Sequence, residues 1–421
     1  MPAPVPVPVT DSPVAADPAP PRPARKGAAS AVLLVTGFVL LSLNTRVAFG
    51  QLGPLAPVAG FGTGALTLLG LLPPLCMGLF APLAATARRR LGEERGLFWA
   101  SALLLVGAVV RILGLPGLFA GTVLVSIATA VVNVLIPVFV RSRFDPRRVG
   151  VMMGVYALSM GAGSALVAAL MVPVWEGSGH SWRTAIGLAV VPAALAALGM
   201  APQLRYAERG VERGAGPAPV RVGVLGGGDR GLAGSLIAFF GLQTLLFYTT
   251  LAWLPAILVD AGVAEGTAGG MQSLFILGVA IGGFLTPVLA AARADQRPHL
   301  FAVVLICALG YAGLLAAPAS APALWALVLG IGLGGGQAVA GVLYVKRGRD
   351  HDHVAALSTV AQTGGYLIAA AGPVTASVLH AVTDTWTVPL LAFVGVLLLS
   401  TVASLRAGHD RPARPTAADR G

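Results

Sequence analysis

The sequence predicts an all-α membrane protein whose roughly twelve transmembrane helices form two pseudo-symmetric six-helix bundles. Three observations predict this fold class: the composition, the lengths of the apolar stretches, and an internal repeat. Of the 421 residues, 56% are hydrophobic and only 11% are charged, and the mean hydropathy is +0.83. Because soluble domains carry roughly 25% charged residues, this composition is suited to a lipid bilayer.

The apolar stretches have the length of membrane spans, since a helix needs roughly 20 apolar residues to cross the hydrocarbon core. We expect spans over residues 30–58, 64–87, 96–114, 117–140, 149–173, 183–204, 232–258, 267–292, 299–317, 322–345, 354–380 and 386–405. The expected domains are a disordered cytoplasmic tail (1–28), an N-terminal bundle (29–204), a cytoplasmic linker (205–231), a C-terminal bundle (232–405) and a second cytoplasmic tail (406–421).

Basic residues predict the orientation of these spans. Most of the 28 Lys and Arg residues lie in the tails and in alternate connections, as in Arg88–Arg90 and Lys346–Arg349, whereas Arg183 lies at the opposite side. Because basic residues favour cytoplasmic loops, we expect a multi-pass protein of the plasma (inner) membrane with both termini in the cytoplasm. The net charge of +11 is then a topology signal, and we expect no nucleic-acid partner.

An internal repeat relates the two expected bundles. Gly78, Pro82 and Arg88 in the second span have the same spacing as Gly283, Pro287 and Arg293 in the eighth. Polar residues also recur in the first span of each half, as Asn44-Thr45 and Gln243-Thr244. Two related bundles of this kind hold a solute site between them near the midplane, and access alternates as the halves rock.

Two arginines lie within the expected spans. Charged side chains are costly in hydrocarbon, so an intramembrane charge is a candidate functional residue. Arg46 lies deep in the first span, and we interpret it as functional, against an interfacial or purely structural role. Arg111 lies near the outer end of the third span, where it is either a functional residue or an arginine that snorkels to the interface.

Acids and histidines are absent from the middle of the spans. All 17 Asp and Glu residues and the 6 His residues lie in tails, loops or span ends. Proton-coupled carriers usually titrate a buried carboxylate or histidine. A buried arginine without a buried acid requires an anion from elsewhere, and the simplest source is the solute. We therefore hypothesise that an anionic or oxygen-rich solute binds Arg46.

Neutral polar residues on several spans are candidates to complete this site. Amide groups both donate and accept hydrogen bonds, which suits a small polar solute. For each residue alone, hydrogen bonding between helices is an equally valid interpretation, but together they fit a central cavity. The candidates are Asn133, Gln243, Tyr248, Gln272, Gln337, Gln362 and Tyr366.

Two further motifs carry no function in our interpretation. Gly330–Gly335 matches the dinucleotide pattern G-x-G-x-x-G, but it lies within a span and follows no strand, so it predicts close helix packing. Asp350–His353 resembles a metal cluster, yet no second group of ligands accompanies it. We interpret Cys76 and Cys307 as small buried residues. No cofactor and no metal are therefore expected.

Several motifs resemble the cyanate-permease/2-nitroimidazole-transporter (CynX/NimT) branch of the major facilitator superfamily, over residues from about 30 to 405. They are Leu43–Arg46 with Gly53–Leu55, Asn133–Pro137, Gly241–Gly262, Ala355–Leu367 and Trp386–Leu390. The resemblance implies the twelve-helix facilitator fold and solute transport driven by a gradient rather than by ATP. It also implies that Asn44, Arg46, Gln243, Tyr248, Trp253, Gln362 and Tyr366 face a central cavity.

This chain departs from the wider superfamily between the second and third spans. The superfamily places an acid before the basic run, whereas here Ala87 precedes Arg88. Similar loops occur in the branch, so the branch assignment is unaffected. The departure argues only against a gating ion pair of the kind that the wider superfamily has at this loop.

The expected function is secondary transport of a small anionic or polar solute, such as cyanate or a small organic molecule, by alternating access. Arg46 would neutralise the solute, amides would orient it, and Tyr248 and Trp253 would form the cavity wall. The alternative is efflux of amphipathic or nitroaromatic compounds. An enzyme is not expected, because no acids, histidines or nucleophile cluster at bilayer depth. The expected partners are the solute and the lipid bilayer, and we expect a monomer.

Overall fold

The fold was determined from a computed structural model that describes residues 28–51, 63–205 and 229–408. The helices of the first half of the chain are α1 (Ala28–Asn44), α2 (Val47–Gly50), α4 (Thr63–Phe80), α5 (Pro82–Val110), α6 (Leu115–Arg143), α7 (Val149–Gly177), α8 (Trp182–Gly187) and α9 (Val190–Met200). Those of the second half are α10 (Arg230–Asp260), α11 (Glu265–Ala291), α12 (Arg297–Ala316), α13 (Pro322–Arg347), α14 (His351–Thr383) and α15 (Thr387–Ala407). Two short 3₁₀ helices cover Pro146–Arg148 and Ala201–Arg205.

Each expected membrane span has a helical counterpart in the described chain. Among the described residues, 10 helices are long and apolar enough to cross a membrane, or up to 11 if the bent pair Leu68–Phe80 and Pro82–Val110 counts as one span. Helix α5 is itself broken at Gly92, where φ is 81°. Its first part therefore continues the second expected span, and its remainder is the third. The expected tails and linker lie almost entirely outside the described residues.

Prolines mark the first turn of several helices, where the missing N–H costs no hydrogen bond. Pro82, Pro116, Pro298 and Pro322 occupy such positions in α5, α6, α12 and α13. The first span differs most from expectation. Instead of one helix over 30–58, α1 ends at Asn44 and α2 begins at Val47, and residues 52–58 lie outside the described part.

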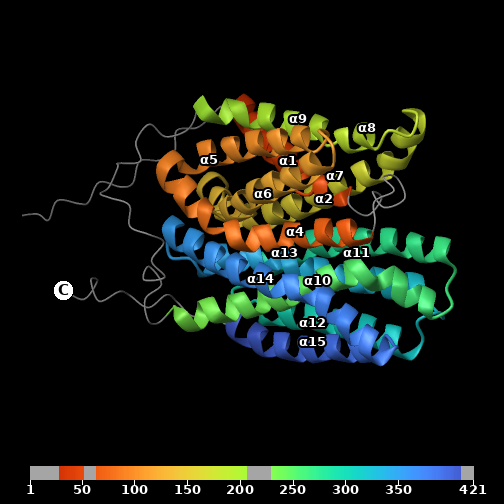
Figure 1. Ribbon diagram of the computed structural model, residues 1–421. Coiled ribbons are helices and arrows are strands. Elements are labelled where there is room, and N and C mark those ends of the chain that lie inside the picture. Colours follow the sequence, from red (N-terminus) through yellow and green to blue (C-terminus); the bar gives the residue numbers. More distant parts are fainter. Residues whose placement is uncertain (1–27, 52–62, 206–228, 409–421) are drawn as a thin grey trace, which may run out of the picture.

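The helices form two bundles, which lie one above the other in Figure 1. The first half contains α1–α9 and the second half contains α10–α15, and the halves meet where α7 packs against α11 and α4 packs against α14. Small residues allow this approach. A Cβ on Gly154 would lie 2.8 Å from the backbone oxygen of Phe284, and one on Gly78 would lie 3.0 Å from the side chain of Leu367.

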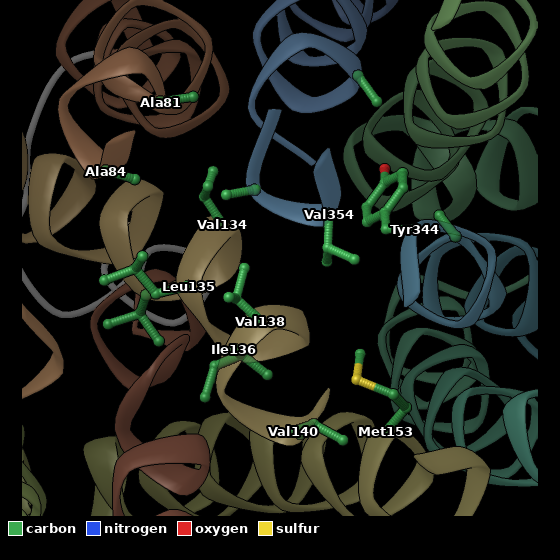
Figure 2. Packing of buried hydrophobic residues seen from close by; sticks show 14 of the residues in the cluster. Ala81, Ala84, Val134, Leu135, Ile136, Val138, Val140, Met153, Tyr344 and Val354 are labelled. Atoms are coloured by element: carbon green, nitrogen blue, oxygen red, sulfur yellow. The ribbon is translucent and has the colours of Figure 1, made fainter. Parts of the chain in front are cut away.

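Described basic residues of both halves gather at one end of the molecule, which we call the basic end: Arg88–Arg90, Arg141, Arg143, Arg147, Arg148, Lys346, Arg347 and Arg349. An apolar cluster joins the halves there. As Figure 2 shows, it contains residues of α6 and α7 from the first half and of α13 and α14 from the second: Val134, Leu135, Ile136, Val138, Val140, Met153, Tyr344 and Val354.

Polar contacts reinforce this closure. Arg141 of α6 donates hydrogen bonds to the backbone oxygens of Val345, Gly348 and Arg349, at 2.8, 2.5 and 2.7 Å. Arg88 of α5 pairs with Asp352 of α14. The C-terminal end of α13 has free carbonyl groups and a partial negative charge, so an arginine beside it is favourable. The two halves are therefore held together at the basic end.

Candidate functional site

A cavity lies between the two halves and is lined by both. Its polar lining consists of Arg46, Asn133 and Tyr156 from the first half and Gln337, Tyr344, Gln362 and Tyr366 from the second. Met153, Met160, Phe240 and Val279 are among its apolar walls. The volume is about 80 Å³. Since one water needs roughly 10–15 Å³ of such space, the cavity suits a solute of a few heavy atoms.

Arg46 reaches the cavity from the interruption between α1 and α2. Its backbone has φ −121° and ψ 8°, so the helix is broken at this residue. Its Nη2 donates to Oε1 of Gln337 in α13 at 3.2 Å, and the guanidinium lies 5.5 Å from the centroid of the Phe247 ring. A side chain of the first half is thus bonded to the second half inside the cavity.

Asn133 forms a second polar link across the cavity. Tyr156 of α7 donates its hydroxyl proton to Asn133 Oδ1 at 2.5 Å, and Asn133 Nδ2 donates to the hydroxyl of Tyr366 in α14 at 3.1 Å. Gln362 Nε2 donates to the Asn133 backbone oxygen at 3.0 Å. The Asn133 amide is already paired with protein groups, so its main contribution is to orient the tyrosines.

The free polar groups of the cavity can all donate: they are Arg46 Nε, Gln337 Nε2 and the Tyr344 hydroxyl, which can also accept. Among the described residues that line it, Arg46 has the one formal charge, and no Asp, Glu or His takes part. Arg46 Nε and Gln337 Nε2 are buried and lack a hydrogen-bond partner within the described chain. A buried donor without a partner is costly, and an acceptor on a solute would satisfy both. The geometry therefore favours a solute that is negatively charged or rich in acceptor atoms.

Several sequence candidates are bonded elsewhere and do not line this cavity. Gln243 donates to Ser400 at 3.0 Å within the second half, and Gln272 donates to the Leu251 backbone oxygen at 2.9 Å. Trp253 donates to the Pro373 backbone oxygen at 3.0 Å. For Gln243 and Gln272 the structure favours the helix-bridging interpretation, and Trp253, which the resemblance places at the cavity, also bonds to another helix instead.

Asn44 and Tyr248 are closer to the site without lining it. Asn44 is the last residue of α1, two positions before Arg46, and it is buried. Tyr248 is half-buried and packs between the apolar clusters of the molecule. The structure thus brings together Arg46, Asn133, Gln337, Gln362 and Tyr366 from the predicted set.

Arg111 neither snorkels nor reaches the cavity. It is 0% exposed, and its Nη1 donates to Oε1 of Gln51 at 2.7 Å. A snorkelling arginine would reach the water interface, so the structure does not support that interpretation. Its hydrogen-bond partner Gln51 in turn donates to the backbone oxygens of Ala185 and Ile186 in the first half.

Tyr156, Tyr344 and Gln51 were not singled out from the sequence. The chain has only 6 tyrosines, and a hydroxyl within an apolar span needs a hydrogen-bond partner when it is buried. That signal identifies Tyr156 and Tyr344 as candidates. Gln51 gives a weaker signal, because the first expected span continued past it without a break.

Comparisons with known proteins agree with the fold described above. A family model described as the Major Facilitator Superfamily matches residues 32–373. The 2-nitroimidazole transporter of Escherichia coli (strain K12) is 34% identical over 399 residues, which cover 91% of this chain and 97% of that protein. The cyanate transport protein CynX of the same organism is 26% identical over 372 residues, covering 86% and 94% of the two chains.

A solved structure has the same fold. The crystal structure of the transporter FucP in its outward conformation gives a TM-score of 0.68 and covers 90% of this chain and 98% of that chain. At 13% sequence identity, this likeness concerns the fold alone.

Proposed function

Because the chain belongs to the major facilitator superfamily, within the group that includes the cyanate and 2-nitroimidazole transporters, we propose that it is a secondary transporter for a small anionic or acceptor-rich solute. Membership of this family makes it a transporter rather than an enzyme. The class of solute and the mechanism are our proposal, which we argue from the cavity.

The observation that carries the proposal is the position of Arg46. A guanidinium in a cavity between two membrane bundles is expensive unless an opposite charge compensates it. The described lining supplies no carboxylate, and the buried donors on Arg46 and Gln337 lack partners. A solute anion would provide the missing charge and accept both hydrogen bonds. The cavity volume of about 80 Å³ agrees with a small solute.

The contacts between the halves support alternating access. Arg46–Gln337 and Asn133–Tyr366 cross the cavity, and Arg141 closes the basic end. Rocking the halves apart at that end would break these bonds and open a path to the solute. In our proposal the basic end faces the cytoplasm, both termini are cytoplasmic, and the chain works as a monomer in the plasma membrane.

Efflux of an amphipathic or nitroaromatic compound is the second candidate. Its support is the apolar part of the lining, with Met153, Met160 and Phe240, together with the identity of 34% to a 2-nitroimidazole transporter. An uncharged compound of that kind would contact the apolar walls and would depend little on the charge of Arg46.

Uptake into proteoliposomes separates the two candidates. The panel contains cyanate, other small monoanions and 2-nitroimidazole, and compares the wild type with Arg46→Gln. Arg90→Gln is the matched control, because it removes one exposed positive charge outside the cavity. We expect Arg46→Gln to abolish uptake of an anion while the variant stays folded. Undiminished transport of a neutral compound by Arg46→Gln, with no anion carried by either protein, would refute the anion proposal and favour efflux.

A further inference from the structure

The short helix α2 depends on contacts with its surroundings. It follows the break at Arg46 and has only 4 residues. A helix of this length is not stable alone, because one or two hydrogen bonds cannot offset the entropy of nucleation. Tertiary contacts therefore determine where α2 lies, and with it the backbone that carries Arg46.

Gln51 attaches the far end of α2 to two other helices. It is the C-cap residue of α2 and is 0% exposed. Its Nε2 donates to the backbone oxygens of Ala185 and Ile186 in α8, at 3.2 and 3.0 Å. Its Oε1 accepts the hydrogen bond of 2.7 Å from Arg111, the C-cap residue of α5. Both ends of the Gln51 amide are thus occupied.

Arg111 is tightly enclosed at this position. A Cβ on Gly121 of α6 would lie 2.6 Å from Arg111 Cγ, and one on Gly107 would lie 3.0 Å from the Gly121 backbone oxygen. The paired glycines therefore leave room for the arginine stem between α5 and α6. Arg111 Nε and Nη2 are buried without a partner among the described residues. Its bond to Gln51 is charge-assisted, which makes it stronger than a bond between neutral groups.

We propose that Arg111 is a positioning residue that acts through Gln51 to hold α2, and so keeps Arg46 directed into the cavity. This inference rests on the proposed function for the role of Arg46. The hydrogen-bonded link from Arg111 through Gln51 to α2, which we call the anchor, is a property of the fold alone. Arg111 does not contact the solute. It instead limits the movement of the outer part of the first span relative to α5 and α8.

Hydrogen–deuterium exchange tests the anchor without any solute. The full-length protein is compared with Arg111→Gln, Arg111→Lys, Gln51→Leu and the double variant Arg111→Gln/Gln51→Leu. We expect the peptide that covers residues 44–51 to exchange roughly tenfold faster in Arg111→Gln and in Gln51→Leu than in the wild type, since a bond to a charged group is lost. Arg111→Lys, which retains a charged donor, should restore part of the protection. The double variant should exchange no faster than Gln51→Leu, because Gln51→Leu already lacks the bond to Arg111 as well as the bonds to α8.

Arg183→Gln is the matched control, because Arg183 is exposed and lies near the start of α8. It should leave exchange unchanged. If Arg111→Gln does not fold, Gln51→Leu tests the link from the other side, together with the bonds to α8 that it also removes. Unchanged exchange of residues 44–51 in folded Arg111→Gln or Gln51→Leu overturns the proposal. An exchange rate that rises equally throughout α1–α9 also overturns it, because the effect would then not be local to α2.

Cyanate uptake then links the anchor to transport. We expect Arg111→Gln to raise KM roughly tenfold with little change in the maximal rate, because the site is present but less often correctly arranged. If Arg46→Gln leaves uptake of every probe unchanged, the proposed function fails, while the exchange result still decides whether the anchor exists. If Arg46→Gln abolishes uptake and the folded Arg111 variants behave as wild type, only the positioning role fails.

Discussion

Arg46 and Gln337 join the two halves of the molecule inside the cavity, through a hydrogen bond of 3.2 Å from Nη2 to Oε1. The bond leaves Arg46 Nε and Gln337 Nε2 as buried donors without partners in the described chain. Because the two residues belong to different halves, a solute that bridges these donors would contact both bundles at once. Solute binding and the relative position of the halves are therefore linked.

Gln337→Glu should weaken anion binding by supplying a competing carboxylate. The new side chain lies within reach of Arg46 and forms an internal ion pair, so a solute anion would have to displace it. We expect KM for a transported anion to rise at least about tenfold, which corresponds to about 1.4 kcal/mol. Gln337→Ala, which removes one donor but adds no charge, should have a smaller effect. Equal KM values for Gln337→Glu and wild type would show that the solute does not bind at Arg46.

Asn133→Leu should loosen the contact between α6, α7 and α14. The substitution is similar in size but leaves the hydroxyls of Tyr156 and Tyr366 without the amide that now pairs them. Each unsatisfied buried group costs about 1–3 kcal/mol, so the melting temperature of the purified protein should fall. The double variant Asn133→Leu/Tyr366→Phe should be less destabilised than the sum of the two single variants. Strict additivity would contradict the link across the cavity.

The positions of the spans follow from the sequence, but the rotation of each helix does not. Span length is set by the hydrocarbon core, and prolines such as Pro116 and Pro322 mark helix starts. Gln243 and Gln337 both lie within apolar helices, yet Gln337 lines the cavity and Gln243 bonds to Ser400. Since a membrane helix is apolar on its lipid side and its protein side alike, hydropathy does not distinguish the two faces.

The helix break at Arg46 is likewise not predicted by the sequence. No proline or glycine stands between Asn44 and Val47, so local propensity predicts a continuous helix. The interruption is stabilised instead by tertiary contacts, including the hydrogen bond from Thr129 in α6 to the Thr45 backbone oxygen, at 3.1 Å. Such contacts between distant segments are not visible in a single sequence, and for the same reason the pairing of Gln51 with Arg111 was not expected.

Gly282→Val should destabilise the second half of the protein. A Cβ at Gly282 of α11 would collide with the backbone oxygen of Ile331 in α13, and a backbone atom cannot move aside as a flexible side chain can. Overpacking of this kind costs about 1–3 kcal/mol, which a thermal melt in detergent can detect. Gly395→Val in α15 is the control, because a Cβ there meets no atom within 4 Å. Equal losses for the two variants would contradict the close contact of α11 with α13.

Arg141→Gln should shift the protein towards the state that is open at the basic end. The substitution removes the guanidinium that bonds to the backbone oxygens of Val345, Gly348 and Arg349, so the closed arrangement loses contacts that the open one does not have. Hydrogen bonds to charged groups contribute about 1.5–3 kcal/mol, which predicts at least a roughly tenfold change in the ratio of the two states.

A cysteine at cavity residue Ala338 reports the change, since the native Cys76 and Cys307 are buried. A membrane-impermeant thiol reagent added from the basic end, in vesicles of known orientation, should label Ala338→Cys faster when Arg141→Gln is present. Arg147→Gln removes an exposed charge from the same end and should not alter the rate, whereas equal labelling in all three backgrounds would mean that Arg141 does not hold the halves together.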